Sequence, residues 1–416
     1  MSKTREALTP PGNPPSAAVA DLRLSPTLQE AFLVEVLASL VKTPSVNPGT
    51  SEKGIADVIE GWLNERSIEL AQVEFAPGRP SVGAIIRGAG DGPTVVLNGH
   101  MDTVPIDDES LWTSDPFGAE VRDGFLYGRG ACDMKAGLAV QIGVAHYLSD
   151  IDPAHLHGSV VLHFAAGEER GEPGTRSLLD AGFTGDFGIT TEPTSLRVAT
   201  ATRGVVTYTL RVKGRSVHAS RAEAGVNPVW ALMPVLALLR DYDAEVRSRA
   251  HPLLPGGSCT PTMIRAGVKE NAVSDYCDIY IDRRLLPGET PESDKAALLA
   301  RLESLTAAQP DLDVELSTIY GVEPAEIDPT SPFAEQVLRA VADVTGESTE
   351  VWGAPFSSDV RNLVNDASIT AVTFGPGDTR FCHCPDERVP VAELEDAAVT
   401  IAKVVVELLT EGRANG

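Results

Sequence analysis

The chain has 416 residues, 43% of them hydrophobic, and a formal net charge of −25. This length exceeds what one core usually holds, so we expect two domains, and the apolar content excludes a disordered or fibrous protein. The acidic excess argues against nucleic acid or an anionic membrane as a partner. Five cysteines without disulfide-like spacing, and no apolar run of about 18 residues, predict a cytoplasmic protein.

The first half of the chain alternates helical and strand patterns. Residues 1–25 are rich in Pro, Ser and Ala and are expected to form a disordered tail. The apolar spacing then predicts helices over 28–41, 54–65, 134–148 and 175–181, and strands over 81–87, 94–98, 159–165 and 187–190. Strands that alternate with helices predict an α/β domain with a mostly parallel sheet.

The pattern changes after about residue 203. Strands over 205–212, 262–268, 275–283 and 314–320, with helices over 227–247 and 291–308, follow the order β-α-β-β-α-β. This order is the split βαβ, or ferredoxin-like, arrangement. The α/β pattern resumes with a helix over 331–344, a strand over 369–374 and a helix over 391–409. We therefore predict an α/β domain of residues 26–203 and 324–416, with an α+β domain of residues 204–323 inserted into it.

Residue types that bind metals follow several predicted strands, at the edge where open α/β sheets place their sites. His100 and Asp102 come after the strand over 94–98 and point to the same side of an extended chain. The histidine can bind a metal while the aspartate fixes its tautomer, although a His–Asp hydrogen bond in a turn is the alternative. Asp133 follows a Gly-rich turn just before a helix, where it serves either as a metal bridge or as a helix N-cap.

The remaining carboxylates and a second histidine have the same kind of position. Glu168 and Glu169 are adjacent carboxylates after a buried strand, and keeping both ionised there requires a cation. One can bind metal while the other accepts a proton; two solvated loop glutamates are the alternative. Glu192 ends another strand, and His383 lies between two cysteines. A structural zinc site at His383 is disfavoured, because no second ligand cluster has the required spacing.

Together these segments resemble the superfamily of aminoacylases, acetylornithine and succinyl-diaminopimelate deacylases, and glutamate carboxypeptidases. The resemblance extends over residues 28–409. It implies two divalent metal ions, one held by His100 and Glu192, the other by Glu169 and His383, with Asp133 bridging them. Charge counting favours two metals as well, because the three carboxylates carry −3 against +4, and a single cation would leave a partly buried cluster negative.

The resemblance also implies catalytic roles. Glu168 is expected to be the general base, and Asp102 to support His100. His218, in the inserted domain, is expected to donate a hydrogen bond to the oxyanion, acting within its own chain or across a homodimer formed through the free sheet face of that domain.

Two residues, Asn271 and Arg284, match positions that contact substrate in the family, and Arg361 lies in a segment, residues 358–361, that resembles a loop lining the cleft. Asn271 and Arg284 lie in the inserted domain, and arginine suits bidentate capture of a carboxylate. Arg361 is either a second carboxylate clamp or the ion-pair partner of Asp359. A small-molecule substrate that carries a carboxylate is therefore expected.

Cys132, Cys382 and Cys384 depart from the family pattern, which usually has a small non-thiol residue before the bridging aspartate. They are either packing residues or thiolates that alter metal preference and weaken one metal site. Zinc is the expected metal, with manganese or cobalt as alternatives.

The expected function is hydrolysis of the amide bond in a small N-acyl amino acid or related compound, by a metal-activated water and a glutamate base. The alternative is an aminohydrolase that releases ammonia from a small amine or ureide, or a dipeptidase or carboxypeptidase, with the same site. A non-catalytic scaffold is disfavoured because the whole ligand set and the base are present.

Overall fold

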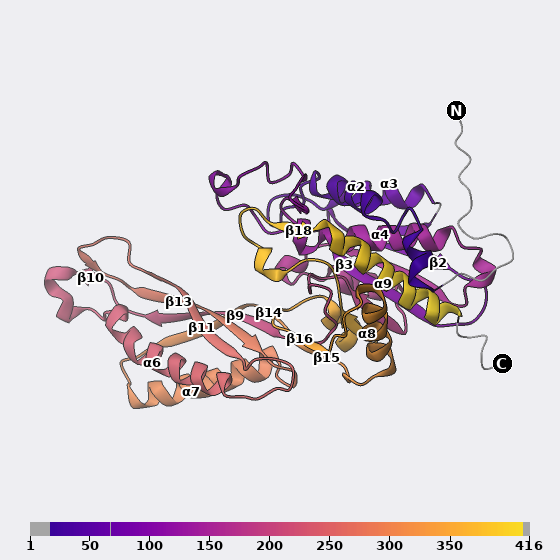
Figure 1. The fold of residues 1–416 in the computed structure, drawn as a ribbon. Coiled ribbons are helices and arrows are strands. Elements are labelled where there is room, and N and C mark those ends of the chain that lie inside the picture. The colour runs from indigo at the N-terminus through magenta and orange to yellow at the C-terminus, as the bar shows by residue number, and fades with distance from the viewer. Residues whose placement is uncertain (1–16, 67, 411–416) are drawn as a thin grey trace. The chain divides into compact units, whose positions relative to one another are not determined.

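The computed structural model describes residues 17–66 and 68–410. The chain divides into two compact units (Figure 1). Unit 1 comprises the described parts of Met1–Thr200, Ile327–Trp352 and Ser358–Gly416, and unit 2 comprises Ala201–Glu326 and Gly353–Ser357. The insert predicted over residues 204–323 lies within unit 2, which begins three residues earlier, ends three residues later and takes in one further short segment.

The predicted tail over residues 1–25 is too long. Residues 1–16 lie outside the described residues, but α1 (Val19–Arg23) is a short helix that buries Leu22 completely. Arg23 forms ion pairs with Glu395 at 2.7 Å and Asp396 at 2.5 Å. The sequence pattern missed α1 because five residues with one buried leucine have no detectable helical period.

Unit 1 is built on a mixed sheet. Its strand order is β1 (Glu69–Ala76), β2 (Arg79–Arg87), β6 (Ser159–Ala165), β3 (Thr94–His100), β7 (Phe187–Thr190), β17 (Thr370–Thr373) and β8 (Ala199–Thr202), and β15 (Ala325–Glu326) and β16 (Trp352–Ala354) pair with β8. The four strands from β6 to β17 are parallel, while β1 and β2 pair antiparallel at one edge. The expected α/β fold is therefore confirmed.

The burial of individual strands explains which of them the pattern could predict. β3 is buried along nearly its whole length, as an apolar strand covered on both faces must be. β1 is exposed or half-buried throughout and carries several polar residues. An edge strand of this kind has no clear apolar alternation, which is why the sequence did not predict it.

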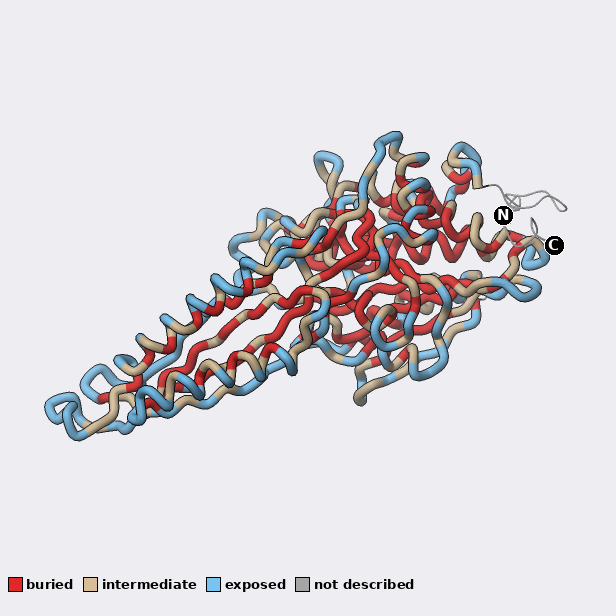
Figure 2. Tube along the Cα trace, turned by 90° about the horizontal axis from the view of Figure 1, so that it is seen from below, coloured by how far each residue is buried: buried red, intermediate tan, exposed pale blue. Residues whose placement is uncertain are grey.

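Helices complete the core of unit 1. They are α2 (Glu30–Val41), α3 (Lys53–Asn64), α4 (Ala136–Ser149), α5 (Gly174–Asp180), α8 (Pro332–Thr345) and α9 (Val391–Thr410). The helix α4 is buried from Ala136 to Leu148, and its small Ala and Gly residues allow α2 and α9 to pack closely against it. Figure 2 shows the buried residues gathered inside each unit and the exposed ones on loops and outer helix faces.

A second, three-stranded sheet ties distant parts of unit 1 together. It consists of β4 (Glu120–Arg122), β5 (Phe125–Tyr127) and β18 (Arg388–Pro390), and Arg388 pairs with Tyr127. β5 precedes Asp133 by a few residues, and β18 follows His383. The pairing of β5 with β18 therefore brings the segments that carry these two side chains into the same region.

Unit 2 has the predicted ferredoxin-like arrangement. In chain order it contains β9 (Gly204–Lys213), α6 (Pro228–Arg247), β11 (Ser258–Ala266), β13 (Tyr276–Leu285), α7 (Pro291–Ala308) and β14 (Val314–Val322), with the antiparallel order β11-β13-β9-β14. Val206, Tyr208, Leu210 and Val212 of β9 alternate toward a buried core beneath α6 and α7, which lie side by side (Figure 1). A separate pair of strands, β10 (Val217–His218) and β12 (Ala272–Val273), completes the unit. Among the described residues, no helix is both long and apolar enough to cross a bilayer.

Candidate metal centre

Parallel strands bring the candidate ligands to one edge of the sheet. β3 lies between β6 and β7, with His100 opposite Ala165 and Asn98 opposite Thr190. The residues that follow these strands therefore meet at the carboxyl edge, as in other open α/β sheets. Asp133 reaches the same place from η2 (Ala131–Lys135), an irregular turn directly before α4.

The side chain of Asp133 lies between the two histidines. His100 Nε2 is 3.2 Å from Asp133 Oδ1, and His383 Nε2 is 3.2 Å from Asp133 Oδ2. A second carboxylate accompanies each histidine: Glu192 Oε1 is 3.7 Å from His100 Nε2, and Glu169 Oε2 is 3.3 Å from His383 Nε2. In a tetrahedral site with metal–ligand bonds of about 2.1 Å, ligand atoms are about 3.4 Å apart. All four separations are close to that value.

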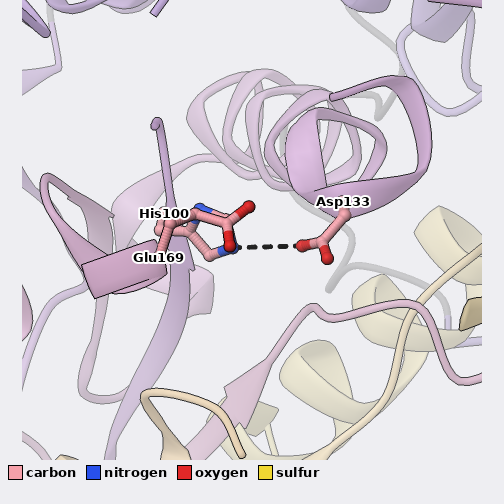
Figure 3. Close-up of side chains that lie close together, drawn as sticks. All are labelled: His100, Asp133 and Glu169. Carbon is pink, nitrogen blue, oxygen red and sulfur yellow. Dashed lines mark hydrogen bonds and ion pairs between the residues drawn. The ribbon is translucent and has the colours of Figure 1, made fainter. Parts of the chain in front are cut away.

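Ligand atoms of His100, Asp133 and Glu169 also lie within 4.8 Å of one another, and Figure 3 shows their side chains together. This grouping would place Glu169 with His100, whereas the pairwise separations place it with His383. We favour the latter because the 3.3 Å separation from His383 is that of two ligands on one ion.

The electrostatics of the cluster fit a pair of cations. Burial, together with repulsion between neighbouring carboxylates, raises the pKa of Glu168 to about 8 and raises the pKa values of Glu169 and Glu192. For Asp133, burial also acts to raise the pKa, but hydrogen bonds to the two histidines lower it overall. Buried Glu169 Oε1 has no hydrogen-bond partner among the described residues. Carboxylates in such a place stay ionised only beside positive charge, and nitrogen and oxygen donors suit divalent cations.

Asp102 does more than the sequence predicted. Its backbone oxygen is 2.9 Å from His100 Nδ1, and its Oδ1 is 3.5 Å from the same atom. Its carboxylate also accepts backbone N–H groups from Gly167 at 2.9 Å, Glu168 at 3.1 Å and Glu169 at 3.3 Å. Asp102 thus orients His100 through its backbone carbonyl, and its fully buried carboxylate orients the turn that carries the two glutamates.

Sequence reasoning missed the residue that holds Asp133. Glu387 Oε1 accepts the backbone N–H groups of Cys132 and Asp133, both at 3.0 Å, and Glu387 Oε2 lies 2.5 Å from Arg129 Nη1. Arg129 and Glu387 are both buried. No local signal could have revealed this role, because the hydrogen bonds join residues more than 250 positions apart.

The predicted general base has an arginine beside it. The side chain of Glu168 is only 13% exposed, and its Oε1 lies 3.7 Å from Arg361 Nη1. Arg361 also approaches Asp359 Oδ1 at 3.3 Å and donates to the Ser358 carbonyl at 3.0 Å. The ion pair between Arg361 and Asp359 is present in the structure, and the alternative role of Arg361 as a second carboxylate clamp stays a prediction.

The other three predicted residues belong to unit 2. His218 and Asn271 are exposed neighbours: His218 pairs with Ala272 in the β10–β12 sheet, and the Ala219 N–H donates to the Asn271 carbonyl. Arg284 lies near the far end of β13, where its guanidinium is engaged with Asp282 at 2.8 and 3.1 Å. The structure therefore groups His218 with Asn271 and separates both from Arg284.

Three cysteines lie in the segments that carry Asp133 and His383. All five cysteines of the chain are free thiols. Cys132 Sγ and Cys382 Sγ lie 3.6 Å apart, while Cys384 Sγ points elsewhere and contacts the Phe381 carbonyl at 3.3 Å.

Comparisons with known proteins agree with this centre. The sequence profile described as peptidase family M20/M25/M40 matches residues 96–407. Acetylornithine deacetylase from Proteus mirabilis is 29% identical over 386 residues, 89% of this chain and 95% of that protein. N-formyl-4-amino-5-aminomethyl-2-methylpyrimidine deformylase from Bacillus subtilis is 25% identical over 410 residues, 91% of this chain and 93% of that protein.

Among solved structures, a dinuclear metal-binding peptidase of the M20 family from Bacillus subtilis has a TM-score of 0.68 at 21% identity, covering 91% of this chain and 98% of the other. The expected superfamily is confirmed, and so is the expected hydrolase acting on C–N amide bonds. Because the profile covers about three quarters of the sequence, the chain belongs to peptidase family M20/M25/M40.

Proposed function

We propose that this protein is a metal-dependent amidohydrolase that converts a small N-acyl amino acid or related amide and water into a carboxylate and an amine. The observation that supports this most is the position of Asp133, whose two oxygens each face a separate His–carboxylate pair. The relatives named as a deacetylase and a deformylase support removal of an acyl group from an amine.

Five side chains would hold two divalent cations, of which zinc is the proposed identity because it binds nitrogen and oxygen ligands in tetrahedral sites. His100 and Glu192 would hold one, His383 and Glu169 the other, with Asp133 shared. When bound, the metals supply Lewis acidity that polarises the scissile carbonyl and lowers the pKa of water. Asp102 and Glu387 keep the ligands in position through the hydrogen bonds described above.

Glu168 is the proposed general base. It is largely buried beside the ligand cluster and is not itself needed as a ligand. Its carboxylate would accept a proton from the attacking water and return it to the leaving nitrogen. Arg361, 3.7 Å away, would limit the rotation of this carboxylate.

Three residues of unit 2 are proposed to act on the substrate. His218 Nδ1 accepts the Ser220 N–H at 3.2 Å, so the neutral ring carries its proton on Nε2. His218 would therefore donate from Nε2 to the oxyanion, with Asn271 beside it as a substrate contact. Arg284 remains a candidate for binding a substrate carboxylate, which would have to replace Asp282 as its partner. We also propose a cytoplasmic homodimer.

A second candidate is hydrolysis of a dipeptide or of a C-terminal peptide bond. The structural similarity to an M20 peptidase favours this candidate, which would use the same residues on another amide. An aminohydrolase that releases ammonia is the third use of the same site. All three share the proton transfer assigned to Glu168, and they differ only in the substrate.

The test is a substrate panel combined with a Glu168→Gln variant. N-acetyl and N-succinyl amino acids and dipeptides would be supplied to metal-loaded protein, and both amine and ammonia release would be measured. Glu168→Gln should retain its metal and lose hydrolysis by about 100-fold or more. Glu120→Gln, which changes an exposed carboxylate of β4, is the matched control. A Glu168→Gln protein with the full rate would show that the base is wrongly assigned.

A further inference from the structure

Two thiols meet beside the metal ligands. Cys132 Sγ and Cys382 Sγ are 3.6 Å apart, although the residues are separated by 250 positions. Cys132 is completely buried and directly precedes Asp133, and half-buried Cys382 directly precedes His383. A disulfide requires an S–S distance of about 2.05 Å, so the thiols are in contact but not bonded.

We propose that Cys132 and Cys382 form an oxidative modification site: a peroxide converts them to a disulfide, and this cross-link weakens the metal position formed by His383, Glu169 and Asp133. The inference rests on the proposed metal-binding function for its consequence. The formation of the disulfide itself depends only on the positions of the two sulfurs.

The reaction balances with a hydroperoxide as the oxidant. The more accessible sulfur, Cys382 Sγ, attacks the peroxide, the O–O bond breaks, and an alcohol (water, when the oxidant is hydrogen peroxide) leaves, so that a sulfenic acid forms. Cys132 Sγ then attacks this sulfur, the S–S bond forms, and the sulfenic hydroxyl departs with the thiol proton as water. Two electrons pass from the two sulfurs to the peroxide.

The position of the thiols explains why a cross-link would reach the metal centre. Closing 3.6 Å to about 2.05 Å requires a relative movement of about 1.5 Å. The Cys132 backbone is anchored by Glu387 at 3.0 Å, so the loop that carries Cys382 must supply most of this movement. His383 is the next residue, and metal–ligand distances tolerate only about 0.2 Å. The ion near His383 should therefore be lost first, while His100 stays in place at the end of β3.

Simple packing of two small thiols is the competing explanation. The hydrogen bond with Cys382 lowers the pKa of the Cys132 thiol, but burial and the nearby carboxylates of Glu387 and Asp133 together outweigh it, so the pKa is raised overall. Contact with Cys132 and burial raise the pKa of Cys382. Oxidation should therefore be slow, and the test needs excess oxidant and a time course. Packing alone predicts no cross-link at any time.

The experiment treats the full-length, zinc-loaded protein with excess hydrogen peroxide. It then measures free thiols, cross-linked peptides by mass spectrometry, zinc per chain, and zinc affinity by chelator competition. The expected result is a peptide that joins Cys132 to Cys382, together with a loss of zinc affinity of about tenfold or more at one of the two sites. Dithiothreitol should reverse both changes. Cys382→Ala and Cys132→Ser should prevent the change. Cys384→Ala, a thiol of the same loop, should behave like the wild type.

Two results would overturn the proposal: no Cys132–Cys382 peptide after prolonged oxidation, or a complete cross-link that leaves zinc content unchanged. Failure of the proposed function would look different, because the untreated protein would then bind no zinc or hydrolyse no amide. In that case the disulfide could still be detected as a cross-linked peptide. Cys382→Ala changes a half-buried loop residue, so it tests the cross-link even if Cys132→Ser does not fold.

Discussion

Replacing Asp102 by asparagine should loosen the metal centre without changing the size of the side chain. The Asp102 carboxylate accepts hydrogen bonds from four N–H groups: the Asn47 amide at 2.9 Å and the backbone of Gly167, Glu168 and Glu169. An asparagine has an NH₂ group in place of one of the two carboxylate oxygens, and this group would face N–H donors from which it cannot accept a hydrogen bond. If the NH₂ takes the place of Oδ2, the bonds from Asn47 and Glu169 are lost.

The size of the effect follows from these two bonds. A hydrogen bond to a charged group contributes about 1.5–3 kcal/mol, so the loss is about 3–6 kcal/mol in all. We expect it to appear mainly as disorder of the turn that carries Glu168 and Glu169, because the rest of β3 and β6 keeps its pairing. Metal affinity should then fall by about 10- to 100-fold, the usual effect of removing a group that orients a ligand.

The assay is zinc affinity by chelator competition, with urea unfolding of the metal-free protein as the second readout. Asp108→Asn is the matched control, because Asp108 also accepts a backbone N–H, from Ser110 at 2.9 Å, but lies on the surface. If Asp102→Asn binds zinc as tightly as wild type and unfolds at the same urea concentration, the hydrogen bonds to the 167–169 turn do not hold the site.

Two further predictions concern buried titratable groups. Burial lowers the pKa of His163 to about 4, so between pH 4 and about 6.5 the unfolded chain binds the extra proton and stability falls as pH drops. When the pH is lowered from 7 to 5, the free energy of unfolding of the metal-free protein, measured with urea, should fall by about 2 kcal/mol more in the wild type than in His163→Gln. An equal fall in both proteins would contradict this prediction. Glu387→Gln leaves Arg129 buried without its ionic partner, so unfolding free energy should fall by about 3–5 kcal/mol, whereas Glu120→Gln should change it little. A change below about 1 kcal/mol in Glu387→Gln would refute that interpretation.

Local sequence patterns predicted most of the elements and the edge where the site lies. β3, α4 and α9 have long apolar stretches or strong spacing, so their limits differ from the predicted ones by only one or two residues. Because β3, β6 and β7 are parallel, placing candidate ligands after each strand also predicted that they would meet. These conclusions needed only the order of elements and the residues at their ends.

The parts that were missed depend on contacts between distant segments. Glu387 reaches the backbone of Asp133 across more than 250 residues, and nothing near Glu387 in the sequence indicates that contact. The N–H groups that Asp102 accepts come from a turn more than 60 residues later. Likewise, the sequence showed that cysteines precede both Asp133 and His383 but not that their sulfurs lie 3.6 Å apart.

The most direct test of the central claim is the zinc content of metal-saturated wild type, His100→Ala and His383→Ala, measured by elemental analysis of desalted protein. The two-ion arrangement predicts about two zinc ions per wild-type chain and about one in each variant, with hydrolysis reduced in both variants. One ion per wild-type chain, or two ions retained after His383→Ala, would contradict the assignment of Asp133 as the shared ligand between two metals.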